Sequence, residues 1–434
     1  MLKSGYKSTQ KPREGEICID ASQLRPGVHV RLPLSWMEHE FVFNSFIIAD
    51  EEQAKRIAAM NLPQIFCDVK RSKVPPLPKQ EATADNLPTE DEKLRFSELK
   101  AQLMAEKAER AKVMTTIRKR LDNAQNHYIG AAKMVVGAFK SFSHNTKESI
   151  KQMSDVSERS AAALLSDPDS ALVLITEKGQ HDGFAAHALS VMTLALLLGK
   201  QTGLPEEALR AIGIGALLHD VGKLSFHPSM LRNQHRNKFE EAVYRTHCQT
   251  GYDAAAKANS LSPAMLAVIL QHHERMDGSG FPDQLKGDEI PFAARMVAIA
   301  NRFDNLTNPI DYLKAMSPSE ALSFMWAKEN KIYDSKLLQL FIKAMGVYPP
   351  GSVVMLSDNR VAAVVSSAPT AHPLSPQVLI YEPEIPRRQA LIIDLAEETS
   401  IKIERPLRLS ERPDEELDYL LPRRKISWFF VDGE

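Results

Sequence analysis

The stretches LLHDVGK (217–223) and QHHERMDGSGFP (271–282) decide the fold of this chain. In each, an apolar segment with helical periodicity ends in two adjacent polar residues, HD in the first and HH in the second. Polar side chains at the end of a buried helix are costly unless they are paired or bound to a ligand. A divalent metal would satisfy both pairs, because imidazole supplies a nitrogen ligand and a carboxylate can bridge two metals.

Histidine is concentrated around these two stretches. Eight of the 13 histidines lie between residues 181 and 273. A single histidine is more often a core or surface residue than a ligand, so His181, His227 and His235 are left without a role. The other histidines and one aspartate end or follow apolar helices, which packing alone explains poorly. The candidate metal ligands are therefore His187, His219, Asp220, His247, His272 and His273.

The pattern around these candidates defines the fold class. Residues 145–345 are almost wholly helical in pattern and apolar on most helix faces, which predicts a compact all-α core. Residues 15–68 alternate in short strand-like runs around one helical stretch, which predicts a small α+β module. Residues 346–434 hold strand-like segments separated by turns and predict a small β-rich extension. We therefore expect a multidomain chain with a central helical bundle.

Between the first module and the bundle we expect a linker and a long helix. Residues 69–88 contain four prolines among charges, which is typical of a linker. Thr89 and Glu92 have capping-box spacing, so a helical stalk is predicted over 89–144. Its spaced leucines and dense charges fit a dimerising coiled coil, and they fit a helix that lies on its own neighbouring domain equally well.

Composition restricts the function classes. The chain has 434 residues, enough for about two to four domains. With 54 Lys and Arg against 55 Asp and Glu, bulk binding to nucleic acid or an anionic membrane is not expected. The basic stretches RPLRLSERP and LPRRKISWFF are predicted to be solvent-exposed surfaces and not a nucleic-acid-binding site. No segment predicts a secretory signal or a membrane span, and three separated cysteines fit the cytoplasm.

The order H…HD…H…HH, with HDVGK and HHERMDGSGFP, resembles the HD-GYP subgroup of the HD phosphohydrolase superfamily. Here the GYP tripeptide is Gly280-Phe281-Pro282, and the resemblance covers about residues 160–345. It implies an HD-type helical bundle with bound metals, usually iron or manganese. It also implies hydrolysis of cyclic di-GMP to linear pGpG, and often on to GMP, by a hydroxide that bridges the metals.

The resemblance also assigns roles by motif. It gives one metal to His187, His219 and Asp220, and a second metal to Asp220, His247, His272 and His273. Lys223 would lie near the scissile phosphate and neutralise charge that develops there. Asp277 and Gly280 would shape the pocket wall, and Gly280 would let the backbone approach substrate or a partner.

Three positions depart from the family pattern. Asn301 stands where most members have an aspartate ligand, and Asp304 is no obvious substitute because the usual pattern already has an aspartate there. Ile310 replaces a substrate-binding arginine, although Lys314 remains and can serve in part. Gly183 replaces a glutamate of trinuclear members, so we expect two metals, Fe or Mn.

Three functions stay open at this point. The first is an active cyclic di-GMP phosphodiesterase. The second is a weak or inactive protein that acts by binding cyclic di-GMP or diguanylate cyclases with GGDEF domains. The third is a metal-dependent hydrolase of another nucleotide. Asn301 and Ile310 are the positions that discriminate among them.

Overall fold

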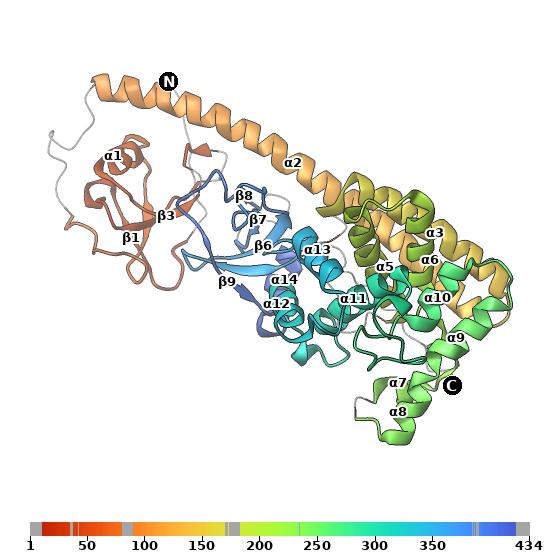
Figure 1. The fold of residues 1–434 in the computed structure, drawn as a ribbon. Coiled ribbons are helices and arrows are strands. Elements are labelled where there is room, and N and C mark those ends of the chain that lie inside the picture. Colours follow the sequence, from red (N-terminus) through yellow and green to blue (C-terminus); the bar gives the residue numbers. More distant parts are fainter. Residues whose placement is uncertain are drawn as a thin grey trace. The chain divides into compact units, whose positions relative to one another are not determined.

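The computed structural model resolves the chain into two compact units, residues 1–117 and 118–434 (Figure 1). The two units are therefore divided inside a long helix. The structure describes residues 11–34, 38–41, 43–79, 90–169, 172, 183–233, 235–383, 385, 387 and 390–421. His181 and the capping residue Thr89 lie outside these residues.

The first unit contains an antiparallel sheet of order β1-β4-β2-β3. The strands and the helix are β1 (Glu16–Ile19), β2 (His29–Arg31), β3 (Ser45–Ile47), α1 (Glu51–Ala59) and β4 (Ile65–Asp68). Asp50 starts α1, because its side chain accepts a hydrogen bond from the Gln53 amide. The buried side chains of the sheet and α1 form one hydrophobic core, which confirms the predicted small α+β module.

Part of the expected linker belongs to this unit. The amides of Lys73 and Leu77 donate to the carbonyls of Gly27 and Gln23, at 2.8 and 3.0 Å. Residues 73–77 therefore lie along the module instead of leaving it as free chain.

The predicted stalk is the 52-residue helix α2 (Glu90–Ser141). In the first unit, Lys107 Nζ donates to the carbonyls of His39 and Phe41 at 2.8 and 2.6 Å. In the second unit, Val135 and Ala138 are part of the helical core. The helix thus packs on its own chain within each unit, and a dimer through it stays a prediction.

The second unit is built on a helical core (Figure 1). Its central helix, α5 (Phe184–Gln201), packs against α3 (Thr146–Ser166), α6 (Glu206–Leu218), α11 (Phe292–Thr307) and α13 (Ser335–Met345). In the described residues, α5 is the one helix long and apolar enough to cross a membrane, and 72% of it is buried inside the protein. The remaining helices are α7 (Pro228–Arg232), α8 (Lys238–Arg245), α9 (His247–Ala256), α10 (Pro263–Gln271) and α12 (Pro318–Glu329).

Two glycines allow the helix ends that carry the motifs to meet. A Cβ on Gly215 of α6 would lie 2.7 Å from Val268 Cβ of α10, so the two helices approach closely because the side chain is absent. A Cβ on Gly222 would lie 2.0 Å from the His247 carbonyl oxygen at the start of α9. The short helix η4 (Val221–Ser225), which follows the HD pair, is thereby held against α9.

The predicted β-rich extension is a five-stranded antiparallel sheet of order β8-β7-β6-β5-β9. Its elements are β5 (Val353–Leu356), β6 (Val361–Ser366), β7 (Gln377–Ile380), β8 (Ile392–Asp394), β9 (Ile403–Leu407) and α14 (Asp414–Leu420). Arg408, from the first basic stretch, pairs with Glu320 of α12 at 3.0 Å. The predicted fold class is therefore confirmed: a central helical bundle with a small module on each side in the sequence. Further short helices among the described residues are η1 (Ala21–Gln23), η5 (Gly287–Glu289), η6 (Tyr312–Lys314) and η8 (Leu409–Glu411).

Candidate metal centre

The predicted ligands of the second unit meet where helices begin and end. His219 ends α6 and Asp220 starts η4, while His247 is the first residue of α9 and His272 ends α10. All four side chains are buried. His187 joins them from the first turn of α5.

The three fully buried imidazoles share one hydrogen-bond arrangement. Each Nδ1 contacts the backbone carbonyl three residues earlier: His219 with Ala216 (2.6 Å), His247 with Tyr244 (2.7 Å) and His272 with Ile269 (3.0 Å). Because a carbonyl only accepts, Nδ1 must carry the proton and donate it. Each Nε2 therefore keeps its lone pair, which is the state of a metal-ligating histidine.

These lone pairs converge on one carboxylate. Asp220 Oδ2 lies 3.5 Å from His187 Nε2 and 3.4 Å from His219 Nε2. Asp220 Oδ1 lies 3.4 Å from His247 Nε2 and 3.6 Å from His272 Nε2. Each oxygen thus faces one set of donors. We call His187, His219 and Asp220 the first ligand group, and His247, Cys248, His272 and His273 the second; in each group the ligand atoms lie within 4.8 Å of one another.

His187 is oriented by a carboxylate that the sequence analysis set aside. Its Nδ1 lies 2.6 Å from Asp304 Oδ2, and Asp304 is buried on α11. A histidine held in this way by a carboxylate has its ring direction and tautomer set and its basicity raised. Asp304 is therefore a positioning residue for the first ligand group.

The charges of the HDVGK stretch form an ion pair between buried Asp220 and partly buried Lys223. Lys223 Nζ lies 2.6 Å from Asp220 Oδ2 and 5.0 Å from the centre of the Tyr244 ring. Burial alone would raise the pKa of Asp220, but the ammonium of Lys223 holds it well below its usual range. Burial alone would lower the pKa of Lys223, but Asp220 raises it above its usual range. Asp220 is therefore an anion and Lys223 a cation near neutral pH.

Three imidazoles near this pair are neutral at ordinary pH because they are buried. Burial lowers the pKa of His272 to about 3, and it also lowers the pKa values of His247 and His273. Neutral imidazole is the form that binds metals.

The arrangement fits divalent metals better than it fits an apo structure. The His187 and His219 Nε2 atoms are 3.3 Å apart, and those of His247 and His272 are 3.4 Å apart. Two lone pairs at this distance repel, and a cation between them removes the repulsion. Within the described residues, Asp220 Oδ1 and His273 Nε2 are buried atoms without a hydrogen bond of ordinary geometry. The donor set therefore suits two metal positions with Asp220 between them.

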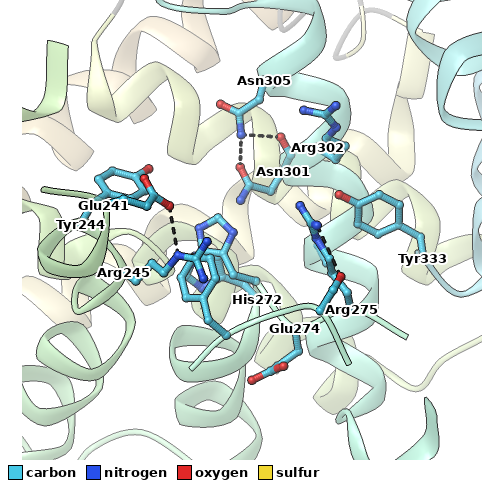
Figure 2. A pocket seen from close by; sticks show the side chains of 14 residues that line it. Glu241, Tyr244, Arg245, His272, Glu274, Arg275, Asn301, Arg302, Asn305 and Tyr333 are labelled. Atoms are coloured by element: carbon cyan, nitrogen blue, oxygen red, sulfur yellow. Dashed lines mark hydrogen bonds and ion pairs between the residues drawn. The ribbon is translucent and has the colours of Figure 1, made fainter. Parts of the chain in front are cut away.

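A cavity of about 310 Å³ opens beside the second ligand group (Figure 2). His272, His273, Asn301 and Phe281 line it, and the His273 ring stacks on Phe281 at 4.5 Å. Three arginines also line the cavity. They are Arg245, which pairs with Glu241 at 3.0 Å, Arg302, which pairs with Glu329 at 2.6 Å, and Arg275. Aromatic and cationic side chains together suit a ligand with bases and phosphates.

Asn301 lies in this cavity wall as the sequence position suggested. It is buried on α11, and Figure 2 shows its side chain joined to Asn305. Asn305 Nδ2 donates to Asn301 Oδ1 at 2.7 Å and to the Asn301 carbonyl at 2.9 Å. The amide oxygen that would coordinate a metal is therefore held by a neighbour.

The other residues assigned to substrate lie elsewhere. Asp277 is exposed and accepts from the Ser279 amide at 2.9 Å, and Lys314 is exposed and pairs with Asp311 at 3.2 Å. Neither residue lines the cavity. Ile310 is 67% exposed. Their roles in substrate binding stay predictions.

Gly280 is buried against the turn that follows the histidine pair. A Cβ there would lie 2.5 Å from Glu274 Cα and 2.6 Å from the His273 carbonyl oxygen. The absence of a side chain at Gly280 therefore lets the backbone pack against residues 273–275 of the same chain. Sequence reasoning also missed Glu274, whose buried carboxylate accepts three backbone amides, from Asp283, Gln284 and Leu285, at 2.7 to 3.1 Å.

Fold and centre together define a metal-dependent phosphohydrolase. Residues 160–337 match the HD domain family, and residues 16–153 match a domain of unknown function (DUF3391). The HD domain that the motifs predict is therefore confirmed for residues 160–337, after an N-terminal region that matches a different family. The predicted family and enzyme class are thus confirmed.

Three relatives show the range of this similarity. A cyclic di-GMP phosphodiesterase of Pseudomonas aeruginosa is 28% identical over 352 residues, which is 80% of this chain and 81% of that protein. The cyclic di-GMP phosphodiesterase response regulator RpfG of Xanthomonas campestris is 34% identical over 37% of this chain and 44% of its own length. A 3′3′-cGAMP-specific phosphodiesterase of Vibrio cholerae is 29% identical over 36% of this chain and 31% of its own length.

Proposed function

We propose that this chain is a metal-dependent phosphodiesterase that hydrolyses cyclic di-GMP to pGpG, and on to GMP. The observation that supports the proposal best is the pair of ligand groups on either side of the Asp220 carboxylate. Such a pair suits two metals that act on one phosphate. The similarity to the Pseudomonas phosphodiesterase, which extends over most of both chains, supports the substrate.

The ligand groups would hold two divalent metals, for which we propose Fe or Mn. When bound, such metals polarise the phosphate and lower the pKa of a water. Asp304 would hold the His187 ring in its ligating direction. The carbonyls of Ala216, Tyr244 and Ile269 would do the same for the three buried imidazoles.

Lys223, in contact with Asp220, would stabilise the transition state. Hydrolysis breaks one P–O3′ bond, joins a water oxygen to phosphorus and passes a proton to the released 3′ oxygen. Negative charge on the phosphoryl oxygens grows during this step. Since Asp220 keeps Lys223 protonated, its ammonium can neutralise that charge in a site with little water.

The cavity beside the second ligand group would hold the dinucleotide. Phe281, stacked on His273, offers an aromatic face for a guanine, and the neighbouring arginines offer donors for phosphate or base oxygens. Arg302 is held by Glu329, so its direction in the cavity is set before substrate arrives.

One observation favours a second candidate, a protein that binds cyclic di-GMP with weak or no turnover. The Asn301 amide brings no negative charge, and its oxygen already accepts from Asn305. Such a protein would act by binding partners. Binding to GGDEF-domain proteins stays a prediction. A cytoplasmic location also stays a prediction.

Hydrolysis by anaerobically purified protein tests the proposal. Cyclic di-GMP and 3′3′-cGAMP are supplied separately to Fe-loaded and Mn-loaded protein, and metal content is measured on the same samples. Asp220→Ala removes the shared carboxylate, and Asp253→Ala removes an exposed carboxylate of α9 as a matched control.

We expect linear product from the wild type and from Asp253→Ala, and none from Asp220→Ala. Two metals with no turnover under either loading would favour the binding protein. Faster turnover of 3′3′-cGAMP than of cyclic di-GMP would overturn the proposed substrate.

A further inference from the structure

We propose that the thiolate of Cys248 is a metal ligand in the second ligand group. The inference rests on the metal dependence proposed above and names a donor that the motif does not supply. It concerns the cysteine directly after His247, in the first turn of α9.

The position of the sulfur supports this role. Cys248 Sγ lies 3.5 Å from His247 Nε2, and the side chain is 0% exposed. Its sulfur and one ring nitrogen each of His247, His272 and His273 all lie within 4.8 Å of one another. Four donors this close together suit a metal that would also take Asp220 Oδ1 and a water or substrate oxygen, at a coordination number above four.

Two other atoms point to a missing cation at the same place. Asp220 Oδ1 is buried without a hydrogen bond and lies 3.4 Å from His247 Nε2. His273 Nε2 is also buried without a hydrogen-bond partner among the described residues. Buried polar atoms of this kind are rare and require an explanation. A metal in the second ligand group explains both.

The charge of the centre gives the thiolate a function. Asp220 is the only carboxylate in the two ligand groups, and Asn301, in the cavity wall with His272 and His273, brings an uncharged amide. On metal binding, the Cys248 S–H bond breaks, its proton passes to solvent water, and sulfur donates its lone pair to the metal. The second ligand group thereby regains one negative charge.

A thiolate also changes which metal is preferred. Sulfur donors select Zn and Fe over the harder Mn, because a soft ligand matches a softer cation. We therefore infer that iron is favoured over manganese in the second ligand group.

The alternative is that Cys248 only fills space, as buried cysteines often do. Cys67 provides the comparison, since it is also 0% exposed and its Sγ lies 3.8 Å from Ser72 Oγ in the N-terminal sheet. Cys248→Ala and Cys67→Ala remove the same atoms from two buried sites. Only the first is expected to alter metal binding.

Cobalt substitution provides a readout that does not depend on activity. The full-length protein is stripped of metal, reloaded anaerobically with Co²⁺ and examined for thiolate-to-cobalt charge transfer in the near ultraviolet. Bound Co²⁺ is counted by titration, and folding is checked by circular dichroism. Cys248→Ser serves as a second variant if the alanine protein does not fold.

We expect the band in the wild type and in Cys67→Ala, and its loss in both Cys248 variants. The affinity for the second Co²⁺ should fall at least ~10-fold, as even outer-shell losses have this effect. Two bound Co²⁺ without the band in the wild type, or a band that persists in Cys248→Ala, would overturn the inference.

The outcomes separate this inference from the proposed function. If the protein hydrolyses cyclic di-GMP but shows no charge-transfer band, the proposed function stands and Cys248 is not a metal ligand. If the band is present but no cyclic dinucleotide is hydrolysed, Cys248 is a metal ligand and the proposed function is wrong. A wild type that takes up no Co²⁺ rejects both.

Discussion

Among the described residues, histidines are buried in both units, but only those of the helical unit are arranged for metal. His39 in the N-terminal unit is as deeply buried as His219 and His247 in the helical unit. Burial lowers the pKa of His39 to about 3, with Lys107 adding to the effect, and burial lowers the pKa of His272 to a similar value. Neither depth nor a low pKa therefore distinguishes a metal ligand.

The neighbours of the rings make the difference. His39 Nε2 lies 3.2 Å from the side-chain oxygen of Asn44 and donates a hydrogen bond to it, and the nearby charge is the cation Lys107. In the helical unit Nδ1 carries the proton and each Nε2 faces the anion Asp220. A convergent set of lone pairs around a carboxylate binds a cation, whereas a donor beside an ammonium does not.

Removal of the shared carboxylate should have the largest effect. Asp220→Ala takes away the anion that both ligand groups use, so we expect fewer than one metal per chain and a loss of activity greater than ~10²-fold. His39→Gln removes a buried imidazole from the other unit and should leave both quantities unchanged. Metal analysis and initial rates on the two variants test the contrast, and equal metal loss in both would break it.

The buried lysines provide the next test. Lys223→Met removes the cation beside Asp220, and we expect kcat to fall ~10²–10³-fold with metal content retained. Lys107→Met removes a buried lysine that donates to the His39 and Phe41 carbonyls. Its expected effect is on stability alone. If Lys223→Met left kcat within twofold of the wild type, the role of Lys223 at the phosphate would be wrong.

Loss of the carboxylate behind His187 should have a smaller effect. Asp304→Asn keeps the size of the side chain and removes the charge that orients His187 Nδ1. The expected loss of metal affinity is ~10–100-fold, confined to the first ligand group. Co²⁺ titration would show one weakened site and one unchanged site; two equally weakened sites would contradict the division into groups.

The same contrast explains how far the sequence could be interpreted. His219, Asp220 and the histidine pair stand out because apolar helices end in them, and the structure brings them together. The role of Asp304 could not be found, since its partner lies 117 residues away and local spacing says nothing about that contact.

Another residue was missed for a related reason. Cys248 adds no motif of its own, so only the folded α9 and α10 place its sulfur among histidines. Asp277 is exposed in the Gly-rich turn, and its place in the pocket wall stays a prediction. The flanking strands could be predicted from alternation, whereas their order in each sheet depends on long-range pairing.

A negative charge at position 301 tests whether this residue can contribute to metal binding in the second ligand group. Asn301→Asp places a carboxylate in the cavity wall near His272, and we expect metal affinity to rise ~10-fold. In the Cys248→Ala background the same change should recover most of the affinity that was lost. Asn305→Asp, one helical turn further on, is the matched control for added charge. If Asn301→Asp raises the metal affinity in neither the wild-type nor the Cys248→Ala background, residue 301 does not reach the metal.

The pH dependence of stability tests the comparison in the N-terminal unit. An ordinary histidine takes up its proton near pH 6.5, but folded His39 stays neutral down to about pH 3. Between these values the unfolded state binds more protons, so stability is complete above pH 6.5 and falls as the pH falls. The loss from pH 6.5 to 5 is about 2 kcal/mol. Hydrogen exchange of α1 and β4 amides in the full chain should show this slope, and His39→Gln should remove it. An equal slope in the variant would mean that other groups cause the acid sensitivity, and that the neutral state of a buried histidine carries no cost in this unit.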